Sequence, residues 1–343
     1  MRSSDSYLPK KLIRFHFGCS WCFLLWLLVQ TPAGAQEATK VQVSEKSAVA
    51  SGGARSFGVD DTQLLSEIQG DQANEAPFSR QAPRKFRWLR NVGMTAIWLP
   101  GDGDDFGMTD FRFTGSVFLP VPALKSALVI TPSFTVDYLN GPVSRDLPPR
   151  LYLASASFFW MSKPTKNLQI RFGVSPTIAS DFEASNNAFR LPIFAVVTYQ
   201  WNPEWQFLLG VTYLDRNDVN VLPIAGAIWT PTEDVRVELT IPRPRLAKRI
   251  WLPWDAGLEA ENWVYLAGEL GGGTWAIRRT SGVDDEVTLR DFRILLGWER
   301  KMPDGINFRL EGGYVFGRRI EYESDTEDLS PSDAIFLRAG WTF

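Results

Sequence analysis

Apolar and polar side chains alternate along the segment 306–322, and this alternation limits the possible fold more than any other feature of the chain. One set of alternate positions is mainly apolar or aromatic: Ile306, Phe308, Leu310, Gly312, Tyr314, Phe316, Arg318, Ile320 and Tyr322. The intervening set is mainly charged or small: Asn307, Arg309, Glu311, Gly313, Val315, Gly317, Arg319 and Glu321. Successive side chains of a β-strand point to opposite faces of the sheet. The segment is therefore predicted to be a strand with one apolar face and one polar face.

The same period of two recurs from about Gly93 to the C-terminus, with clear examples at 111–119, 168–175, 205–213 and 235–241. The predicted strands reach the length of roughly 9–11 residues that crosses a bilayer at a tilt. Strands in soluble sheets are usually about 5–6 residues long. No stretch after Val29 has the roughly 18 uninterrupted apolar residues expected of a membrane-spanning helix. The pattern predicts an all-β protein, a transmembrane antiparallel up-and-down β-barrel.

The predicted connections differ in length in a regular way. Short turns are expected at 162–166, 202–204, 230–233 and 301–305, and longer polar loops at 101–107, 140–149, 178–188, 215–220, 280–286 and 321–332. Short periplasmic turns and longer outward loops are typical of bacterial outer-membrane barrels, whose strand number is even. Counting Arg245 to Pro253 as a strand, after an outward-facing turn at Pro242-Arg243-Pro244, gives about 14 strands, with about 12 as the alternative.

The region before the predicted barrel divides into two parts. Residues 1–35 have a basic start, an apolar stretch from Phe17 to Val29 and the small residues Ala33-Gly34-Ala35, the pattern of a cleaved secretory signal peptide. Residues 36–85 are polar and are predicted to be a disordered periplasmic segment, in which Thr62 to Ile68 can form a short amphipathic helix. Residues 86–343 are predicted to be the barrel.

The final strand carries the most specific motif of the chain. Its alternate positions are apolar and end on an aromatic residue: Ile335, Leu337, Ala339, Trp341 and Phe343. This terminal strand resembles the C-terminal signature of bacterial outer-membrane β-barrel proteins, including barrel families of unknown function. The resemblance implies an outer-membrane location, membrane lipid as surroundings, and recognition of the strand by the barrel assembly machinery. It also implies closure of the last strand against the first.

The polar faces of the predicted strands supply the candidate functional residues. The side chains expected to line the lumen are Arg112, Asp137, Arg171, Arg190, Arg236, Glu238, Arg309, Glu311 and Arg319. Around 14 strands can enclose a water-filled space, so a passive pore for small polar solutes is the favoured function. The alternative is a structural or surface-exposed barrel whose lumen is plugged by ion pairs.

Other functions are less favoured by the composition. Signal cleavage would remove His16, Cys19 and Cys22, which are the chain's only histidine and cysteines, so a barrel enzyme would lack the usual base or nucleophile. The mature chain would carry 32 basic and 38 acidic residues, a net charge of −6 that does not favour nucleic acid. No cofactor or metal site is expected, since Gly101–Gly107 departs from the EF-hand pattern. Gly271-Gly272-Gly273 is predicted to be a bend or bulge in a strand.

Overall fold

The computed structural model describes residues 89–343, except 102–104, 122–125, 142–145, 185, 256–259, 304 and 325–326. The signal peptide and the polar segment predicted for residues 1–35 and 36–85 lie outside the described residues. The strands are β1 (Leu89–Leu99), β2 (Gly107–Val121), β3 (Ser126–Asn140), β4 (Arg150–Ser162), β5 (Leu168–Val174), β6 (Thr177–Ser180), β7 (Phe189–Arg190), β8 (Ile193–Gln200), β9 (Trp205–Tyr213), β10 (Val221–Thr232), β11 (Val235–Ile241), β12 (Arg245–Ile250), β13 (Glu261–Arg278), β14 (Asp284–Lys301), β15 (Asn307–Tyr322) and β16 (Ala334–Thr342).

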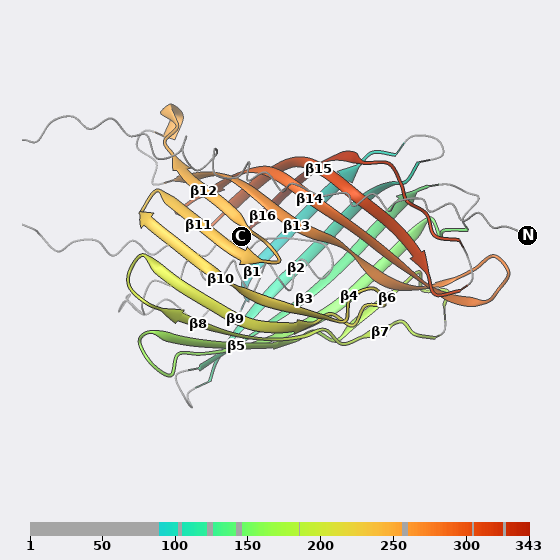
Figure 1. Ribbon diagram of the computed structural model, residues 1–343, viewed down its shortest axis with the longest axis horizontal. Helices are drawn as coiled ribbons and strands as arrows, with labels where there is room; N and C mark the ends of the chain where they lie inside the picture. Colours follow the sequence, from blue (N-terminus) through green and yellow to red (C-terminus); the bar gives the residue numbers. More distant parts are fainter. Residues whose placement is uncertain are drawn as a thin grey trace, which may run out of the picture. The chain divides into compact units, whose positions relative to one another are not determined.

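The strands form one closed antiparallel barrel in which each strand pairs with its neighbours along the chain (Figure 1). The ring closes where β1 pairs with β16, in a register that runs from Gly93 opposite Thr342 to Trp98 opposite Leu337. Val92 and Phe343 complete this seam, because each backbone amide donates to the other residue's carbonyl oxygen. Closure gives both edges of the described sheet a partner, as a bilayer would require, because an unpaired edge in lipid is costly.

Two of the barrel strands are each interrupted once. Pro176 follows β5 and Pro192 precedes β8, and proline cannot donate a hydrogen bond to a neighbouring strand. The β6 and β7 segments continue beyond these breaks, since β6 pairs with both β4 and β7. Counting β5–β6 and β7–β8 as single strands gives the predicted 14-strand barrel.

The outer face of the barrel is apolar, as the period of two predicts. Exposed apolar side chains alternate with buried ones along β8, β9, β15 and β16, among others. Large exposed side chains include Phe113, Phe172, Val197, Leu209, Leu239, Leu296, Leu310 and Leu337. Of the tryptophans near strand ends, Trp201 is exposed and Trp205 stacks on Trp229 at a ring distance of 5.7 Å. Trp263, opposite Glu299 in β14, instead packs with the interior.

The alternation in β15 changes phase near its outer end. Gly317 has a positive φ of 60°, and the register with β14 shifts here between the pairs Arg290–Arg319 and Phe292–Phe316. Beyond this bulge Ile320 and Tyr322 are buried in the interior, so the sequence-based assignment of these two residues to the outer face was wrong. A β-bulge inserts extra residues into one strand and thereby exchanges its two faces.

Candidate functional site

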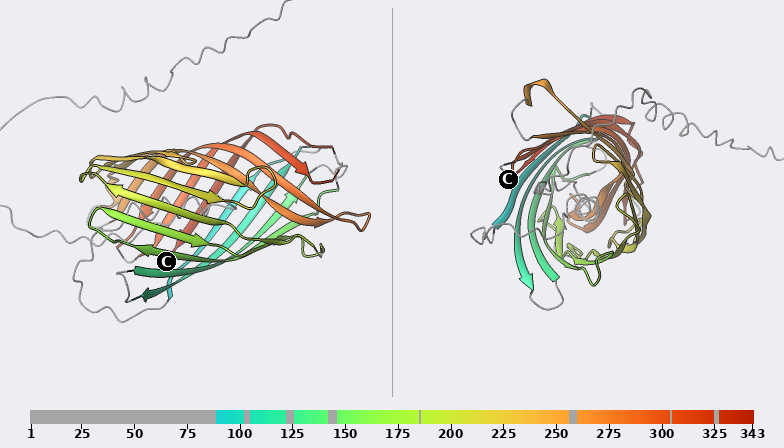
Figure 2. Two further views of the ribbon diagram at one scale, coloured as in Figure 1. Left: turned by 60° about the horizontal axis from the view of Figure 1, so that its bottom comes forward. Right: turned by 90° about the vertical axis from the view of Figure 1, so that its left-hand side faces the viewer.

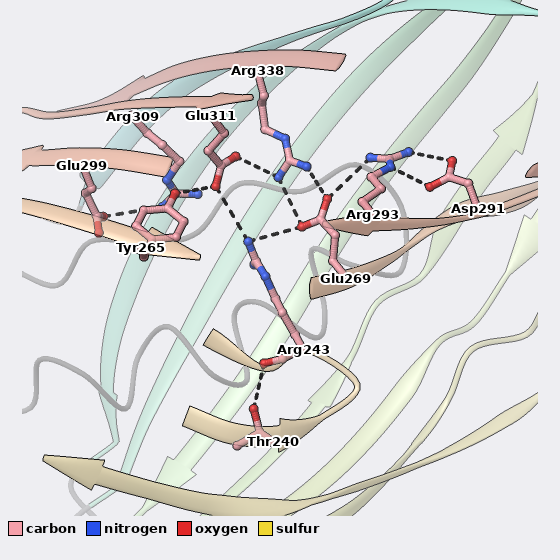
Figure 3. A network of polar contacts seen from close by, with 10 residues as sticks. All are labelled: Thr240, Arg243, Tyr265, Glu269, Asp291, Arg293, Glu299, Arg309, Glu311 and Arg338. Carbon is pink, nitrogen blue, oxygen red and sulfur yellow. Dashed lines mark hydrogen bonds and ion pairs between the residues drawn. The ribbon is translucent and has the colours of Figure 1, made fainter. Parts of the chain in front are cut away.

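A network of ion pairs lines one side of the lumen, and it converges on Glu269 of β13 (Figure 3). The Glu269 carboxylate accepts from the guanidinium of Arg338 on β16. It also lies 3.3 Å from Arg243 Nη2, in the β11–β12 turn, and 3.6 Å from Arg293 Nη1 on β14. The side chain of Glu269 has no exposed surface. Three arginines from three separate elements therefore share one buried carboxylate.

The network continues toward the periplasmic end of the lumen through Glu311 and Glu299. Arg338 Nη1 lies 3.0 Å from Glu311 Oε2, and the hydroxyl of Tyr265 donates to Glu311. Glu299 lies 3.1 Å from Arg245 and 3.6 Å from Arg309. Buried charges are costly unless they are paired and hydrogen-bonded. The alternation of acidic and basic groups along this wall supplies those partners.

Polar residues also face inward at the outer end of the network. Arg293 forms a two-bond pair with Asp291, with distances of 2.6 and 3.0 Å. On the neighbouring wall, Arg112 Nε donates to Thr135 Oγ1 at 2.9 Å. Asp110 of β2 is directly opposite Asp137 of β3, and both are buried. The charged wall thus extends from the β11–β12 turn across β13–β16 to β3.

The hairpin formed by β13 and β14 closes over the outer mouth of the barrel. Its bend is at Gly271-Gly272-Gly273, which confirms the predicted bend; Gly272 has a φ of 106°, and a Cβ there would overlap the carbonyl oxygen of Leu289. Beyond the bend, β13 forms a parallel bridge between Ala276 and Ser180 of β6. In the end-on view of Figure 2, the orange hairpin turns inward from the ring of strands. The hairpin therefore crosses the lumen to the opposite wall.

The two faces of this hairpin make different contacts. One face packs Trp275, Ile277, Val287 and Leu289 into the interior apolar cluster, which also holds Phe106, Met108, Leu151, Ile320 and Tyr322. On the other face Glu286 accepts from Arg190 at 2.7 Å and from Asn217 at 2.6 Å. Arg216 donates to the Leu289 carbonyl oxygen at 3.0 Å. Apolar packing on one side and hydrogen bonds on the other hold the hairpin across the mouth.

A small cavity lies beside the hairpin. A cavity of about 20 Å³ is lined by Leu99, Phe106, Met108, Asp137, Trp275, Leu289, Arg293 and Arg318, among others. This volume holds about one water molecule. Arg318 spans part of the cavity wall, because its guanidinium donates to the carbonyl oxygens of Ser332 and Phe106. Among the described residues, side chains of the hairpin, β1, β2 and β15 thus pack around this small cavity at the outer end of the lumen.

The architecture decides the class of this protein. A closed ring of 14 antiparallel strands presents apolar side chains outward and buries its charged side chains inside. This distribution is the reverse of a soluble protein's and suits a lipid exterior. The chain is a bacterial outer-membrane β-barrel. The part of the chain that the structure describes holds no helix long and apolar enough to span a bilayer.

Known proteins similar to this chain are found among solved structures. No family model and no curated protein matches the chain. Solved structures similar to it include LpxR from Salmonella typhimurium, with a TM-score of 0.36, 10% identity, and coverage of 74% of this chain and 99% of that one. OpdK from Pseudomonas aeruginosa with vanillate has a TM-score of 0.30, 10% identity, and coverage of 74% and 97%. TM-scores of this size carry no argument about function, which rests on this chain's own residues.

The structure places most of the predicted lumen residues on the inner face. Arg112, Asp137, Arg171, Glu238 and Glu311 are buried, and Arg190, Arg236 and Arg309 are nearly so. Arg319 is the exception: its side chain is 48% exposed and pairs with Glu321 at 3.3 Å, on the face opposite the buried Ile320. The assignment of Arg319 to the lumen was therefore wrong, because the bulge at Gly317 reverses the two faces of β15.

Sequence analysis did not single out the residues at the centre of the network. Arg293 and Arg338 stand at polar positions of alternating strands, so the rule that found Arg309 could also have found them. Glu269 gives no such signal, because the alternate positions before it, Trp263, Tyr265 and Ala267, are apolar. Arg243 carries no such signal, since it stands in a turn and reaches Glu269 only through the fold. Asp102 and Asp104, of the loop compared with a calcium site, lie outside the described residues.

The terminal signature residues lie on the outer face. Ile335, Leu337, Trp341 and Phe343 are exposed, while the intervening Phe336 and Arg338 are buried. This arrangement lets one strand contact lipid with one face and the charged network with the other. Recognition by the assembly machinery remains a prediction.

Proposed function

We propose that this protein is a structural or surface-exposed outer-membrane barrel whose lumen is closed in its resting state, and not a permanently open pore. The observation that carries the proposal is the β13–β14 hairpin, which crosses the outer mouth and bonds to the opposite wall. Asp181 N donates to Ala276 O at 3.1 Å, and Arg278 N donates to Asp181 Oδ2 at 2.7 Å. These bonds join segments that are far apart in the barrel wall.

The charged wall supports the same proposal. An aqueous channel would leave its lining side chains in contact with water, whereas Glu311 and Arg338 are 0% and 1% exposed. Pairing with fixed partners also removes the net field that a selective pore uses to attract ions. The favoured pore of the sequence analysis thus has less support from the geometry than its plugged alternative.

Catalysis is not part of the proposal. The candidate groups of the network are arginines, carboxylates and one tyrosine, and each carboxylate at its centre is paired with arginine. A general base needs a free proton-accepting group within reach of a substrate. The buried ion pairs stabilise the barrel instead.

Planar-bilayer recording on the purified mature protein tests the proposal. We expect the wild-type protein to insert without stepwise conductance over the range where general porins are open. A control chain that lacks residues 274–289, replaced by a short Gly-Ser turn, shows whether the hairpin or the charged wall makes the closure. Stable open steps from the wild-type protein would overturn the proposal in favour of the passive pore.

A small-solute pore that opens when the hairpin leaves the mouth is the second candidate. Its support is the bend at Gly272, because a glycine with positive φ gives the hairpin a defined point about which to turn. A ring of about 14 strands is wide enough to hold water once it is emptied. For this candidate, the wild-type protein would be silent and the chain without residues 274–289 would conduct.

A further inference from the structure

Two arginines are paired on the outer face of the barrel, near the outer ends of β14 and β15. Arg290 is directly opposite Arg319 in the antiparallel register. Residues paired in this way point to the same face with Cβ atoms about 4.5–5.5 Å apart, and like charges in such a pair destabilise a sheet. Ile320, the neighbour of Arg319, is buried inside, so the two guanidinium groups are on the outer face. The pair therefore requires a counter-charge.

The described residues supply part of that counter-charge. Arg319 lies 3.3 Å from Glu321, and the two side chains are 48% and 28% exposed. Arg290 Nε is buried without a hydrogen-bond partner, and no carboxylate of the described residues forms an ion pair with Arg290. A buried donor without a partner costs free energy. Within the described part of the chain, two guanidinium groups thus share one carboxylate.

The neighbouring strands leave this pair accessible. On the β13 side, Arg290 is opposite Gly272, which has no side chain. On the other side, the regular pairing of β16 with β15 ends before Arg319. Beyond that point the described chain forms a single bridge, between Ile320 and Leu329, whose side chains pack inside. A ligand can therefore reach the two guanidinium groups from outside the barrel.

An aromatic surface begins next to the arginines, on the side toward the membrane. Phe292 and Phe316 are opposite each other just before the bulge at Gly317, and their rings stack at 5.8 Å. Tyr314, which is 49% exposed, stacks on Phe316 at 6.4 Å. Aromatic side chains on the outer face mark the membrane interface of such barrels. Arg290 is two residues from Phe292, about 7 Å along the strand, so it stands at the level of the lipid headgroups.

We propose that Arg290 and Arg319 bind the phosphate group of an anionic membrane lipid in the outer leaflet. The planar guanidinium group matches the geometry of phosphate oxygens and binds them through paired hydrogen bonds. The negative charge of the phosphate complements the one carboxylate of Glu321. The acyl chain of the lipid contacts Phe292 and Phe316, which a free phosphate ion cannot use, so the site favours the lipid.

Titration of the purified protein in a nonionic detergent, followed by calorimetry, tests this site. The three probes are dioctanoyl phosphatidic acid, dioctanoyl phosphatidylcholine, whose headgroup has no net charge, and inorganic phosphate. We expect phosphatidic acid to bind about tenfold more tightly than either of the others, the effect of one to two charge-assisted hydrogen bonds. Equal binding of phosphatidylcholine would leave the charge of the arginines without a role and would overturn the proposal. Equal binding of inorganic phosphate would overturn it in favour of a site for soluble anions.

The variant Arg290→Glu separates lost binding from lost folding. It places a carboxylate opposite Arg319, and opposite charges in such a pair stabilise a sheet. We expect its unboiled band to persist to the wild-type temperature or above, while its affinity for phosphatidic acid falls about tenfold. The matched control is Arg278→Gln, at the same end of the barrel, because Arg278 already pairs with Asp284 at 2.8 Å. This control should bind the lipid as the wild type does.

A second variant, Phe316→Ala, tests the contact with the acyl chain. We expect it to lose the advantage of phosphatidic acid over inorganic phosphate and to bind inorganic phosphate unchanged. Wild-type affinity of Arg290→Glu for phosphatidic acid, or an equal loss in Arg278→Gln, would overturn the proposal. None of these readouts depends on conductance, so the closed-lumen proposal and this one fail separately.

Discussion

Glu269 is the residue on which the interior charges depend most directly. Its carboxylate holds the guanidinium groups of Arg243, Arg293 and Arg338 close together, and these groups would otherwise repel one another. Breaking a buried ion pair from one side costs about 3–5 kcal/mol, since the remaining charge stays buried.

Replacement of Glu269 by glutamine should therefore lower the free energy of unfolding by about 3–5 kcal/mol while keeping the side chain's shape. Urea unfolding of the protein in detergent, followed by loss of the fast-migrating unboiled band, measures the effect. Glu204→Gln, in an exposed turn, is the matched control and should leave unfolding unchanged. An unchanged midpoint for Glu269→Gln would remove Glu269 from the centre of the network.

Arg309 separates a plugged lumen from an aqueous one. It lies 3.6 Å from Glu299, and reversing its charge would place a second carboxylate against Glu299 and leave Arg245 as the arginine paired with Glu299. We expect Arg309→Glu to insert but to melt at a lower temperature, with no conductance to alter. A stable variant with a shift toward cation selectivity would instead place Arg309 in an open channel.

At the scale of single residues, the alternation of apolar and polar side chains was enough to assign the lumen residues of the regular strands. The same rule failed for Arg319 because a single glycine at position 317 changes the phase of the strand, and no local pattern marks that glycine as a bulge. Arg243 could not be found, since its role depends on the distance between a turn and a strand that are separated in sequence.

The β13–β14 hairpin is the element that decides between a closed and an open mouth. Sequence alternation predicted its strands and its glycine bend. It could not predict the inward course, because one face of the hairpin packs on the interior apolar cluster and the other bonds to β7 and the β9–β10 loop. The positions of these partners follow only from the closed ring.

A substitution at Glu286 should release this hairpin from the opposite wall. Glu286→Arg would lose the bonds to Arg190 and Asn217 and place two arginines together, so we expect faster trypsin cleavage at Arg278 and Arg279 near the tip. The exchange Arg190→Glu with Glu286→Arg rebuilds the pair with reversed charges and should restore slow cleavage. If both variants are cleaved at the same rate as the wild type, apolar packing alone holds the hairpin.

The tip of the hairpin has a second, pH-dependent contact. Thr280 donates from its hydroxyl and its amide to Asp146, and these bonds hold the pKa of Asp146 below its usual value, with further help from Arg279. A lowered pKa in the folded state means that the contact is complete above the ordinary aspartate pKa. It is lost as the pH falls through the lowered value.

Amide hydrogen exchange at Thr280 measures this contact. Corrected for the intrinsic rate, protection should be constant from neutral pH to about pH 4 and should fall only in more acidic solution. Asp146→Asn should remove the pH dependence. Protection that already falls near pH 6 would contradict the assignment to Asp146.

For the whole molecule, the seam between β1 and β16 determines whether a barrel exists. Trp341 lies opposite Met94 and Phe308, and Phe343 exchanges backbone hydrogen bonds with Val92. The sequence predicted the barrel, its 14 strands and its last strand correctly, because those features follow from local alternation and chain-end motifs.

Replacement of both Trp341 and Phe343 by serine should impair membrane insertion strongly, since the terminal strand then loses the aromatic groups that it presents to lipid. The amount of heat-modifiable protein in the outer-membrane fraction measures insertion. Glu323→Ser, at an exposed loop position, should insert as the wild type does. Normal insertion of the double variant would make the terminal motif accidental.

The mutual bonding of Val92 and Phe343 also sets an order of events in time. Nearly every strand meets its sequence neighbour, so hairpins can form as soon as their residues are available. The last pairing joins residues about 250 positions apart, and such distant contacts are the slowest to form. A partly folded chain can have every hairpin formed and still be an open sheet with two unpaired edge strands. The ring closes only when β16 pairs with β1, so the slowest step of folding is also the one that makes the barrel fit for lipid.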